Sequence, residues 1–193
     1  MQVILASASP RRKDLLEQVN IKPLIFPADF AEVTCAENAR QVVLKNAEGK
    51  CQSVVKQKGD SIPVIAADTI VVIDGEILGK PKSAAEAADM LQHLSGRKHK
   101  VMTGVAVAYE GKLISEVCIT DVFFRELTFE EIIAYVTTGE PLDKAGAYGI
   151  QGQGAILVEK IEGCYNNVVG LPLTQLYLML KKLGVKGIAD KNY

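Results

Sequence analysis

Short apolar, β-branched runs alternate along the chain with segments in which apolar residues recur every three or four positions. This alternation predicts strands interleaved with amphipathic helices. The runs predict strands over residues 2–6, 22–27, 63–73, 76–78, 101–109, 112–124 and 155–161. The periodic segments predict helices from Pro10, over residues 36–55, from Ser83 to near Gly96, from Thr128 to before Gly139, and over residues 171–183.

Local signals mark where the helices begin and where the strands turn. Ser9-Pro10 places a good N-cap residue before a proline at the first helical position. The apolar stripe of that helix consists of Leu15, Leu16 and Val19. Three later helix starts have the spacing of a capping box: Thr34/Glu37, Ser83/Glu86 and Thr128/Glu131. Because hairpins at Asp74-Gly75 and Glu110-Gly111 interrupt the alternation, we expect a mixed, twisted α/β sheet with flanking helices.

Length and charge limit the class of protein. With 193 residues, 48% of them hydrophobic, the chain can bury a core of its own. It shows no internal repeat and no linker, so we predict one domain over residues 1–184 and a polar C-terminal tail over residues 185–193. The formal net charge of −1 argues against a nucleic-acid polymer as partner, but it leaves room for local basic clusters that meet a small polyanion.

The cysteines and the apolar runs indicate the compartment. Four scattered cysteines form no C-x-x-C pair and have no neighbouring histidine: Cys35, Cys51, Cys118 and Cys164. This spacing favours reduced thiols over a zinc site or a disulfide framework. The N-terminal apolar run is too short for a signal peptide, and no run reaches the length of a membrane span. We therefore expect a cytoplasmic protein with no membrane partner.

The N-terminal motif Ser7-Ala8-Ser9-Pro10-Arg11-Arg12 has the composition of an anion site. The first strand delivers Ser7 to the sheet edge, and the helix that follows begins with unsatisfied N–H groups. Those donors and the helix dipole attract an anion. Arg11 and Arg12 add planar donor forks that fit phosphate oxygens. The alternative is an N-cap followed by surface arginines.

Asp68 interrupts an otherwise apolar run over residues 64–73. A carboxylate is costly to bury unless it is paired, bound to a metal or placed in a cleft. In a doubly wound sheet such an acid lines the ligand crevice at the strand ends. A strand-end aspartate can also cap a turn or pair with a core arginine, but the setting favours a functional role.

Further candidate contacts come from two lysines, a second acid and an amide. Lys50 lies on the long predicted helix, and Lys80 stands between a glycine and a proline after the first hairpin, so each can meet a phosphate or stay a solvated charge. Glu32 can share a metal with Asp68 or be an ordinary loop residue. The glycine-rich stretch around Gln151 lets backbone approach a flat ligand, and the amide offers a donor and an acceptor.

Several familiar catalytic motifs are absent from the sequence. It contains no P-loop, no dinucleotide-binding glycine pattern after a strand and no G-x-S-x-G elbow. Neither His93 nor His99 has the setting of a catalytic base. Acid–base work therefore falls to carboxylates.

Six motifs follow one another along nearly the whole chain: Leu5-Ala6-Ser7-Ala8-Ser9-Pro10-Arg11-Arg12, Ala67-Asp68-Thr69, Gly79-Lys80-Pro81, Leu94-Ser95-Gly96, Asp143-Lys144-Ala145-Gly146-Ala147-Tyr148-Gly149-Ile150-Gln151-Gly152 and Val169-Gly170-Leu171-Pro172. In this order they resemble the Maf proteins, also called septum-formation inhibitor homologues, which are nucleoside triphosphate pyrophosphatases. The resemblance implies a fold similar to the inosine triphosphate pyrophosphatases, with two lobes around a cleft, and a homodimer.

The resemblance also implies a reaction. A nucleoside triphosphate is hydrolysed between its α and β phosphates, with Mg²⁺ or Mn²⁺, to the monophosphate and pyrophosphate. The Gly-Ile-Gln-Gly form together with Ala-Asp-Thr is similar to the subgroup that acts on dTTP and UTP, in contrast to the one that acts on 7-methyl-GTP. The expected role is house-cleaning of nucleotide pools, with a role in cell-division arrest and a cell-division partner as a further expectation.

The family's site residues map onto this chain position by position. Asp68 matches the general base and a metal ligand, and Glu32 matches the second acid of the metal site. The phosphate-contacting positions correspond to Ser7, Arg11, Lys50 and Lys80, and those linked to base choice correspond to Arg12, Thr69 and Gln151. The chain departs from the family at Ala31, where a second adjacent acid is usual, so its metal binding can be weaker or different.

Two other functions stay open at this stage. One is a nucleotide-binding regulator of septum formation with little turnover. The other is a pyrophosphatase for a modified nucleotide, for which dTTP and UTP are substitutes. Release of pyrophosphate from a panel of nucleoside triphosphates discriminates between all three.

Overall fold

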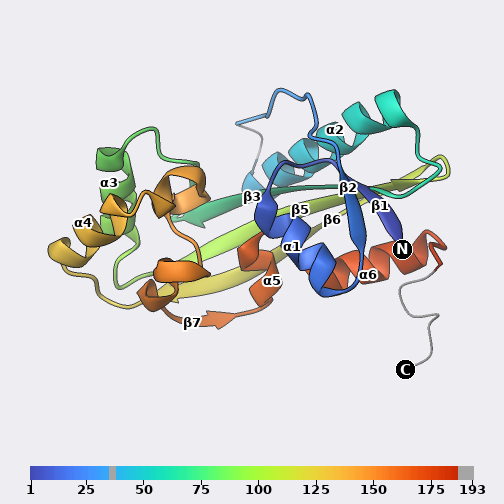
Figure 1. Cartoon of the computed structure of the whole chain (residues 1–193). Helices are drawn as coiled ribbons and strands as arrows, with labels where there is room; N and C mark the ends of the chain where they lie inside the picture. The colour runs from blue at the N-terminus through green and yellow to red at the C-terminus, as the bar shows by residue number, and fades with distance from the viewer. Residues whose placement is uncertain (35–37, 187–193) are drawn as a thin grey trace. The chain divides into compact units, whose positions relative to one another are not determined.

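The computed structural model describes residues 1–34 and 38–186 (Figure 1). The strands are β1 (Gln2–Leu5), β2 (Lys22–Ile25), β3 (Val64–Ile73), β4 (Glu76–Leu78), β5 (Lys98–Tyr109), β6 (Lys112–Phe124) and β7 (Val158–Glu162). The helices are α1 (Pro10–Gln18), α2 (Ala39–Lys58), α3 (Ala84–Leu94), α4 (Phe129–Thr137), α5 (Tyr165–Val169) and α6 (Leu173–Lys182). Three 3₁₀ turns are η1 (Glu140–Asp143), η2 (Ala145–Ala147) and η3 (Gly152–Leu157).

The seven strands form one sheet in the order β2-β1-β3-β5-β6-β7, with β4 beside β3. Strand β1 pairs in parallel with β2 and β3, whereas the β3–β4 and β6–β7 pairs are antiparallel. The predicted mixed α/β sheet with flanking helices is therefore confirmed. The chain divides into two compact units: unit 1 comprises Met1–Asp68, Thr103–Cys118 and the chain from Gly170 onward, and unit 2 comprises Thr69–Met102 and Ile119–Val169.

In unit 1, one face of the strands packs against α2. Side chains alternate across a strand, so Ile4 on β1 and Val64 and Ala66 on β3 point to the same face. They share a buried cluster with Ala47 and Cys51 of α2. Figure 1 shows α2 on one side of these strands and α1 and α6 on the other. By the same alternation Asp68, two residues after Ala66, belongs to the face that α2 covers.

Unit 2 has a core of its own. It combines apolar residues of β3 to β6 with those of α3 and α4. The rings of His99, Phe124 and Tyr148 meet edge to face within it, with centroids 4.7–5.3 Å apart. Such T-shaped pairs are favoured by the ring quadrupoles. His99 is thus a core residue of β5, consistent with its exclusion as a catalytic base.

Most of the predicted helix starts are confirmed. Helix α1 begins at Pro10, and α4 has the full capping box of Thr128 and Glu131. The predicted contribution of Val19 to the stripe of α1 is wrong: Val19 is the C-cap and is 41% exposed. Helix α2 starts later than predicted because the side chain of Asn38 caps it by accepting a hydrogen bond from the Gln41 N–H. The predicted box ending at Glu37 lies outside the described residues, as does most of the predicted tail.

The C-terminal third differs more from prediction. The predicted strand over residues 155–161 begins instead at Val158, because Gly152–Leu157 forms the 3₁₀ turn η3. At its first residue, Gly152, the backbone has a left-handed φ of 65°, which glycine adopts readily. Helix α5 was not predicted. Helix α6 begins at Leu173, two residues after the predicted start, with Pro172 as its N-cap.

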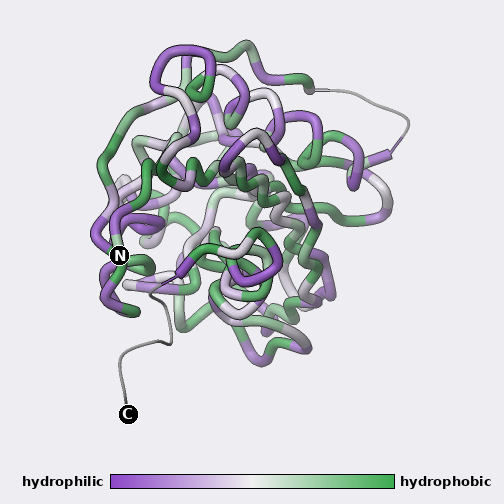
Figure 2. Tube along the Cα trace, turned by 90° about the vertical axis from the view of Figure 1, so that its right-hand side faces the viewer, coloured by the Kyte–Doolittle hydropathy of each residue, from purple (hydrophilic) through white to green (hydrophobic). Residues whose placement is uncertain are grey.

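Figure 2 shows hydrophilic and hydrophobic residues interspersed along the chain. In the part of the chain that the structure describes, no helix is both long and apolar enough to cross a membrane. Within the described residues, Cys51, Cys118 and Cys164 are in no disulfide, and Cys35 lies outside that part of the chain.

Candidate active site

The carboxyl end of β1 lies at a switch in strand order within unit 1. The chain leaves β1 through α1 to reach β2 on one side, whereas β3 pairs with β1 on the other. In parallel α/β sheets such a point opens a crevice beyond the strand ends, where ligands bind. The register places Leu5 opposite Ile65, so Ser7 and Asp68 both follow within three residues of the same row of the sheet.

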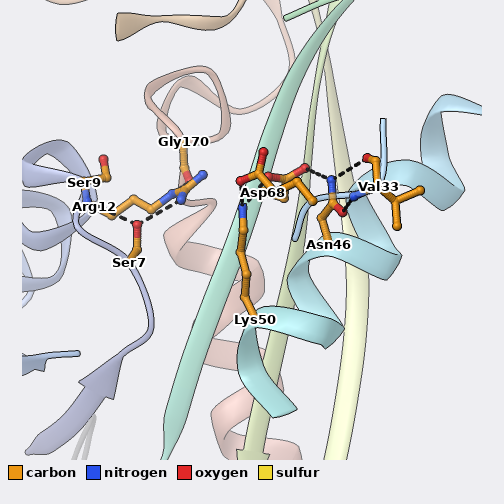
Figure 3. A network of polar contacts seen from close by, with 9 residues as sticks. Ser7, Ser9, Arg12, Val33, Asn46, Lys50, Asp68 and Gly170 are labelled. Carbon is orange, nitrogen blue, oxygen red and sulfur yellow. Dashed lines mark hydrogen bonds and ion pairs between the residues drawn. The ribbon is translucent and has the colours of Figure 1, made fainter. Parts of the chain in front are cut away.

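Ser7 is held by the helix that follows it. Its Oγ accepts hydrogen bonds from the Ser9 N–H at 3.2 Å and from Nη1 of Arg12 at 3.1 Å (Figure 3). A hydroxyl has two acceptor lone pairs and one donor, so these contacts use the lone pairs and the O–H can donate to an anionic oxygen. The side chain of Ser9, the N-cap of α1, makes no capping hydrogen bond. The first-turn N–H groups are therefore not capped by that hydroxyl.

Arg12 ties α1 to the start of the C-terminal segment. Its Nε donates to the Gly170 carbonyl at 2.9 Å. Burial lowers the pKa of Arg12, and the negative charge of Asp68 acts in the opposite direction. Arg12 is thus a fixed, desolvated cation of unit 1 that interacts electrostatically with Asp68. Arg11 lies beside it in the first turn of α1 and is half-buried.

Asp68 is a buried carboxylate whose two oxygens have different partners. Nζ of Lys50 donates to Oδ1 at 2.7 Å, and Nδ2 of Asn46 donates to Oδ2 at 3.0 Å (Figure 3). The same ammonium lies 2.5 Å from Oε1 of Glu32. The side chains of Lys50 and Asp68 are 13% and 10% exposed, whereas that of Glu32 is 57% exposed. Two acids and one cation, all predicted from the sequence, therefore converge on one point.

Asn46 is a site residue that the sequence reasoning missed. It lies one helical turn before Lys50, is 3% exposed, and binds both backbone groups of Val33. Oδ1 accepts from the Val33 N–H at 2.7 Å, and Nδ2 donates to the Val33 carbonyl at 3.0 Å. The sequence did carry a signal for Asn46, because it is a polar residue in the apolar stripe of α2 that contains Val43 and Ala47. An amide buried in such a stripe must find hydrogen-bond partners.

The loop that carries Glu32 is fastened to α2 at three places. Oγ of Ser53 donates to the carbonyl of Asp29 at 2.8 Å, and Asn46 holds Val33. Between them the Phe30 ring packs against Gly49, where an added Cβ would lie 2.2 Å from the ring. The three helix positions are three or four residues apart and so share one face. This fastening explains how an exposed loop acid reaches the ammonium of Lys50.

The remaining predicted residues belong to unit 2. Thr69 follows Asp68 on β3 and is half-buried, and Lys80 and Gln151 are exposed. The Gly146 N–H donates to the Gly79 carbonyl at 3.0 Å, which joins the segment of Lys80 to the glycine-rich stretch.

The oxygens around Lys50 are suitable for a hard cation. Among the described residues, no three His, Cys, Asp or Glu side chains form a ready metal cluster. Asp68 and Glu32 nevertheless each direct one carboxylate oxygen at the same ammonium. Mg²⁺ is usually bound by one or two carboxylates, with water and substrate phosphates completing its octahedron. The residues present therefore fit a divalent metal that is shared with a phosphate.

Sequence comparison places the chain among known proteins. The family described as Maf-like protein matches residues 2–183. A protein of Shigella sonnei (strain Ss046), named dTTP/UTP pyrophosphatase, is 49% identical over 177 residues, which cover 91% of this chain and 90% of that protein. A protein of the same name from Escherichia coli O157:H7 is 48% identical over the same shares of both chains. One from Shigella flexneri, named nucleoside triphosphate pyrophosphatase, is also 48% identical.

A solved structure supports the fold. The HAM1 protein from Coxiella burnetii superposes with a TM-score of 0.56 and 17% sequence identity, over 94% of this chain and 99% of that one. At this identity the likeness concerns the fold alone.

Proposed function

The chain belongs to the Maf family, and from this premise we propose that it hydrolyses dTTP and UTP to the monophosphate and pyrophosphate. The observation that carries the proposal is the setting of Asp68 in unit 1. It is a buried carboxylate at the strand-order switch, with one oxygen on Lys50 and the other on Asn46. An acid held in this way is a candidate general base.

Asp68 takes the proton from the water that attacks the α-phosphorus. Its Oδ2 is oriented by Asn46, while Oδ1 contacts a lysine that can exchange this partner for a phosphate oxygen. Hydrolysis of a phosphoanhydride depends mostly on positioning and charge stabilisation, so a fixed base next to fixed cations is the arrangement that it needs.

The phosphate chain binds at the start of α1. The Ser7 hydroxyl, the first-turn N–H groups and Arg11 donate to phosphate oxygens, and Lys50 offsets the charge of the triphosphate and of the leaving pyrophosphate. Arg12 is tied to Ser7 and Gly170 and acts as a fixed element of base choice. For Lys80 in unit 2, the phosphate role rests on the family resemblance.

Asp68 and Glu32 are the residues that would hold Mg²⁺ or Mn²⁺. When bound, the cation supplies charge neutralisation at the phosphate oxygens and makes a coordinated water more acidic. Lys50 now occupies the point on which both carboxylates converge. A bound cation would take the place of the Lys50 ammonium as the partner of both carboxylates, and Lys50 would then pair with phosphate oxygens.

Base choice is assigned to Thr69 and Gln151 with Arg12. The N3–H and O4 of thymine and uracil form a donor–acceptor pair that one carboxamide can satisfy. Cytosine reverses that pattern, so a site arranged for dTTP and UTP rejects it by leaving polar groups unpaired.

The test is to offer a panel of canonical and modified nucleoside triphosphates with Mg²⁺ or Mn²⁺ and to measure released pyrophosphate. Preferential turnover of dTTP and UTP supports the proposal. Preferential turnover of a modified nucleotide would make that nucleotide the substrate in place of dTTP and UTP. Nucleotide binding without release of pyrophosphate from any member of the panel would favour a nucleotide-binding regulator. A homodimer, which the resemblance implies, is tested by light scattering on the same preparation.

A further inference from the structure

Gln151 stands in a short arch of unit 2 whose two ends touch. The arch runs from Gly149 to Gly154, and a Cβ added to Gly154 would lie 2.3 Å from the carbonyl oxygen of Gly149. Gln151 lies between these ends and is exposed, whereas Gly154 is buried. Because its two ends are in contact, a few hydrogen bonds are enough to hold the whole arch in place.

One carboxylate binds two backbone N–H groups of the arch and is itself bound by Tyr135. Oε2 of Glu140 accepts from the Gln153 N–H at 3.2 Å, and Oε1 accepts from the Gly154 N–H at 3.4 Å and from the Tyr135 hydroxyl at 3.0 Å. Glu140 is the first residue of η1, so it lies outside the arch that it holds. Hydrogen bonds to a charged acceptor are stronger than neutral ones.

Tyr135 of α4 fastens the other end of the arch. Its hydroxyl accepts from the Gly149 N–H at 3.2 Å while donating to Glu140. Burial raises the pKa of Tyr135, which keeps this hydroxyl protonated and able to donate. A Cβ on Gly154 would lie 2.6 Å from the same oxygen, so the arch packs directly on the tyrosine.

We propose that Glu140, acting with Tyr135, is a positioning residue that fixes the arch of Gln151 and thereby sets the preference for dTTP and UTP. The inference deepens the proposed function and rests on it for the role of Gln151. Its own basis is a network of four hydrogen bonds: three reach both ends of the arch from η1 and α4, and the fourth joins Tyr135 to Glu140. A mobile carboxamide loses its advantage for one base edge over another, because it no longer presents a fixed donor and acceptor.

The carboxylate has a specific role that a carboxamide cannot fill. Both oxygens of Glu140 accept from donors, so Glu140→Gln must turn its NH₂ group toward at least one N–H or O–H. The substitution keeps the size of the side chain and removes one anchor. Tyr135→Phe removes the hydroxyl and leaves the ring packing.

The experiment measures amide hydrogen exchange over residues 149–154 and kcat/KM for dTTP, UTP and dCTP in the full chain. For Glu140→Gln and Tyr135→Phe we expect faster exchange in the arch. We also expect kcat/KM for dTTP and UTP to fall about tenfold through KM, the effect of one lost anchor, with that for dCTP unchanged. Gln151→Ala should show the same loss of preference without faster exchange.

Glu131→Gln is the matched control. Glu131 is a carboxylate of the same unit that pairs with Arg125 and caps α4 without contacting the arch. Its variant should change neither exchange in the arch nor the preference. Unchanged exchange, or faster exchange with an unchanged preference, in Glu140→Gln would overturn the inference. Failure of the wild type to hydrolyse dTTP and UTP would instead overturn the proposed function, and the exchange data would still decide whether Glu140 holds the arch.

Discussion

Asn46 donates one hydrogen bond of 3.0 Å from Nδ2 to Oδ2 of Asp68, and the same amide binds both backbone groups of Val33. The proposed base and the loop of Glu32 therefore share one anchor on α2. The orientation of the amide is fixed, because its oxygen faces an N–H and its nitrogen faces two acceptors. A change at Asn46 must consequently affect both acids of the site.

Asp68→Asn should abolish most turnover while nucleotide binding is retained. The carboxamide fits the same space but cannot take a proton, and loss of a general base typically costs about 10²–10⁴-fold in rate. Pyrophosphate release measures turnover, and calorimetric titration with dTTP measures binding. Asp121→Asn is the control, since Asp121 is also an aspartate paired with a lysine, Lys100, at 2.8 Å. Normal turnover of the Asp68 variant would remove Asp68 as the base.

Asn46→Asp should move the acidic limb of the pH–rate profile to higher pH. One new oxygen can still accept from the Val33 N–H, but the other faces Oδ2 of Asp68, and two carboxylates at hydrogen-bonding distance resist double ionisation. We expect a shift of at least about one pH unit, by analogy with carboxylate pairs. Asn167→Ala removes another buried amide, one that bonds to the Val101 carbonyl, and should cost stability without moving the limb. A limb that stays in place in Asn46→Asp would show that Asn46 does not control the base.

Gly49→Ala should weaken the function of Glu32 from a distance. In an exposed helix this change stabilises by up to about 1 kcal/mol, but here the new Cβ would lie 2.2 Å from the Phe30 ring. The ring and its loop must move, so the Mg²⁺ concentration for half-maximal activity should rise several-fold. Ser53→Ala loosens the same loop without a clash, by removing the hydrogen bond to Asp29, and should shift the metal requirement in the same direction. Unchanged metal dependence in both variants would show that Glu32 does not contribute to metal binding.

Local signals in the sequence were sufficient for most of the fold. The capping box of Thr128, the hairpin at Asp74-Gly75 and the proline that opens α1 each act within a few residues, so their geometry can be read from the chain alone. Asp68 was recognisable because a charge in a β-branched run demands a partner. The start of β7 was misplaced because the apolar residues Ala155 and Ile156, which were assigned to a strand, belong to a 3₁₀ turn.

Contacts between distant segments could not be predicted in the same way. Asn46 is 22 residues from Asp68, and nothing in the spacing shows that β3 presents the acid to the face of α2. The position of Glu32 depends on where Phe30 and Val33 pack, which only the folded chain decides. The hold of Glu140 on the arch of Gln151 is likewise formed by backbone N–H groups, which carry no sequence signal.

His99 should make stability depend on pH in the mildly acidic range. Burial lowers the pKa of His99 from 6.5 to about 4, so between these values the unfolded chain binds a proton that the folded chain does not. Stability then rises with pH, is fully present above about pH 6.5 and falls as the pH drops toward 4, by at most about 3 kcal/mol. Urea unfolding at several pH values measures this slope.

His99→Phe is the informative variant, because it keeps an aromatic ring beside Phe124 and Tyr148 and removes the titration. It also removes the 2.7 Å contact between Nε2 and the Tyr148 hydroxyl, so its absolute stability at pH 7 should be lower. The comparison therefore concerns the slope between pH 4 and 6.5, which should flatten. His93→Gln, at the only other histidine, should keep the wild-type slope. An equally steep slope in His99→Phe would mean that other groups cause the acid sensitivity.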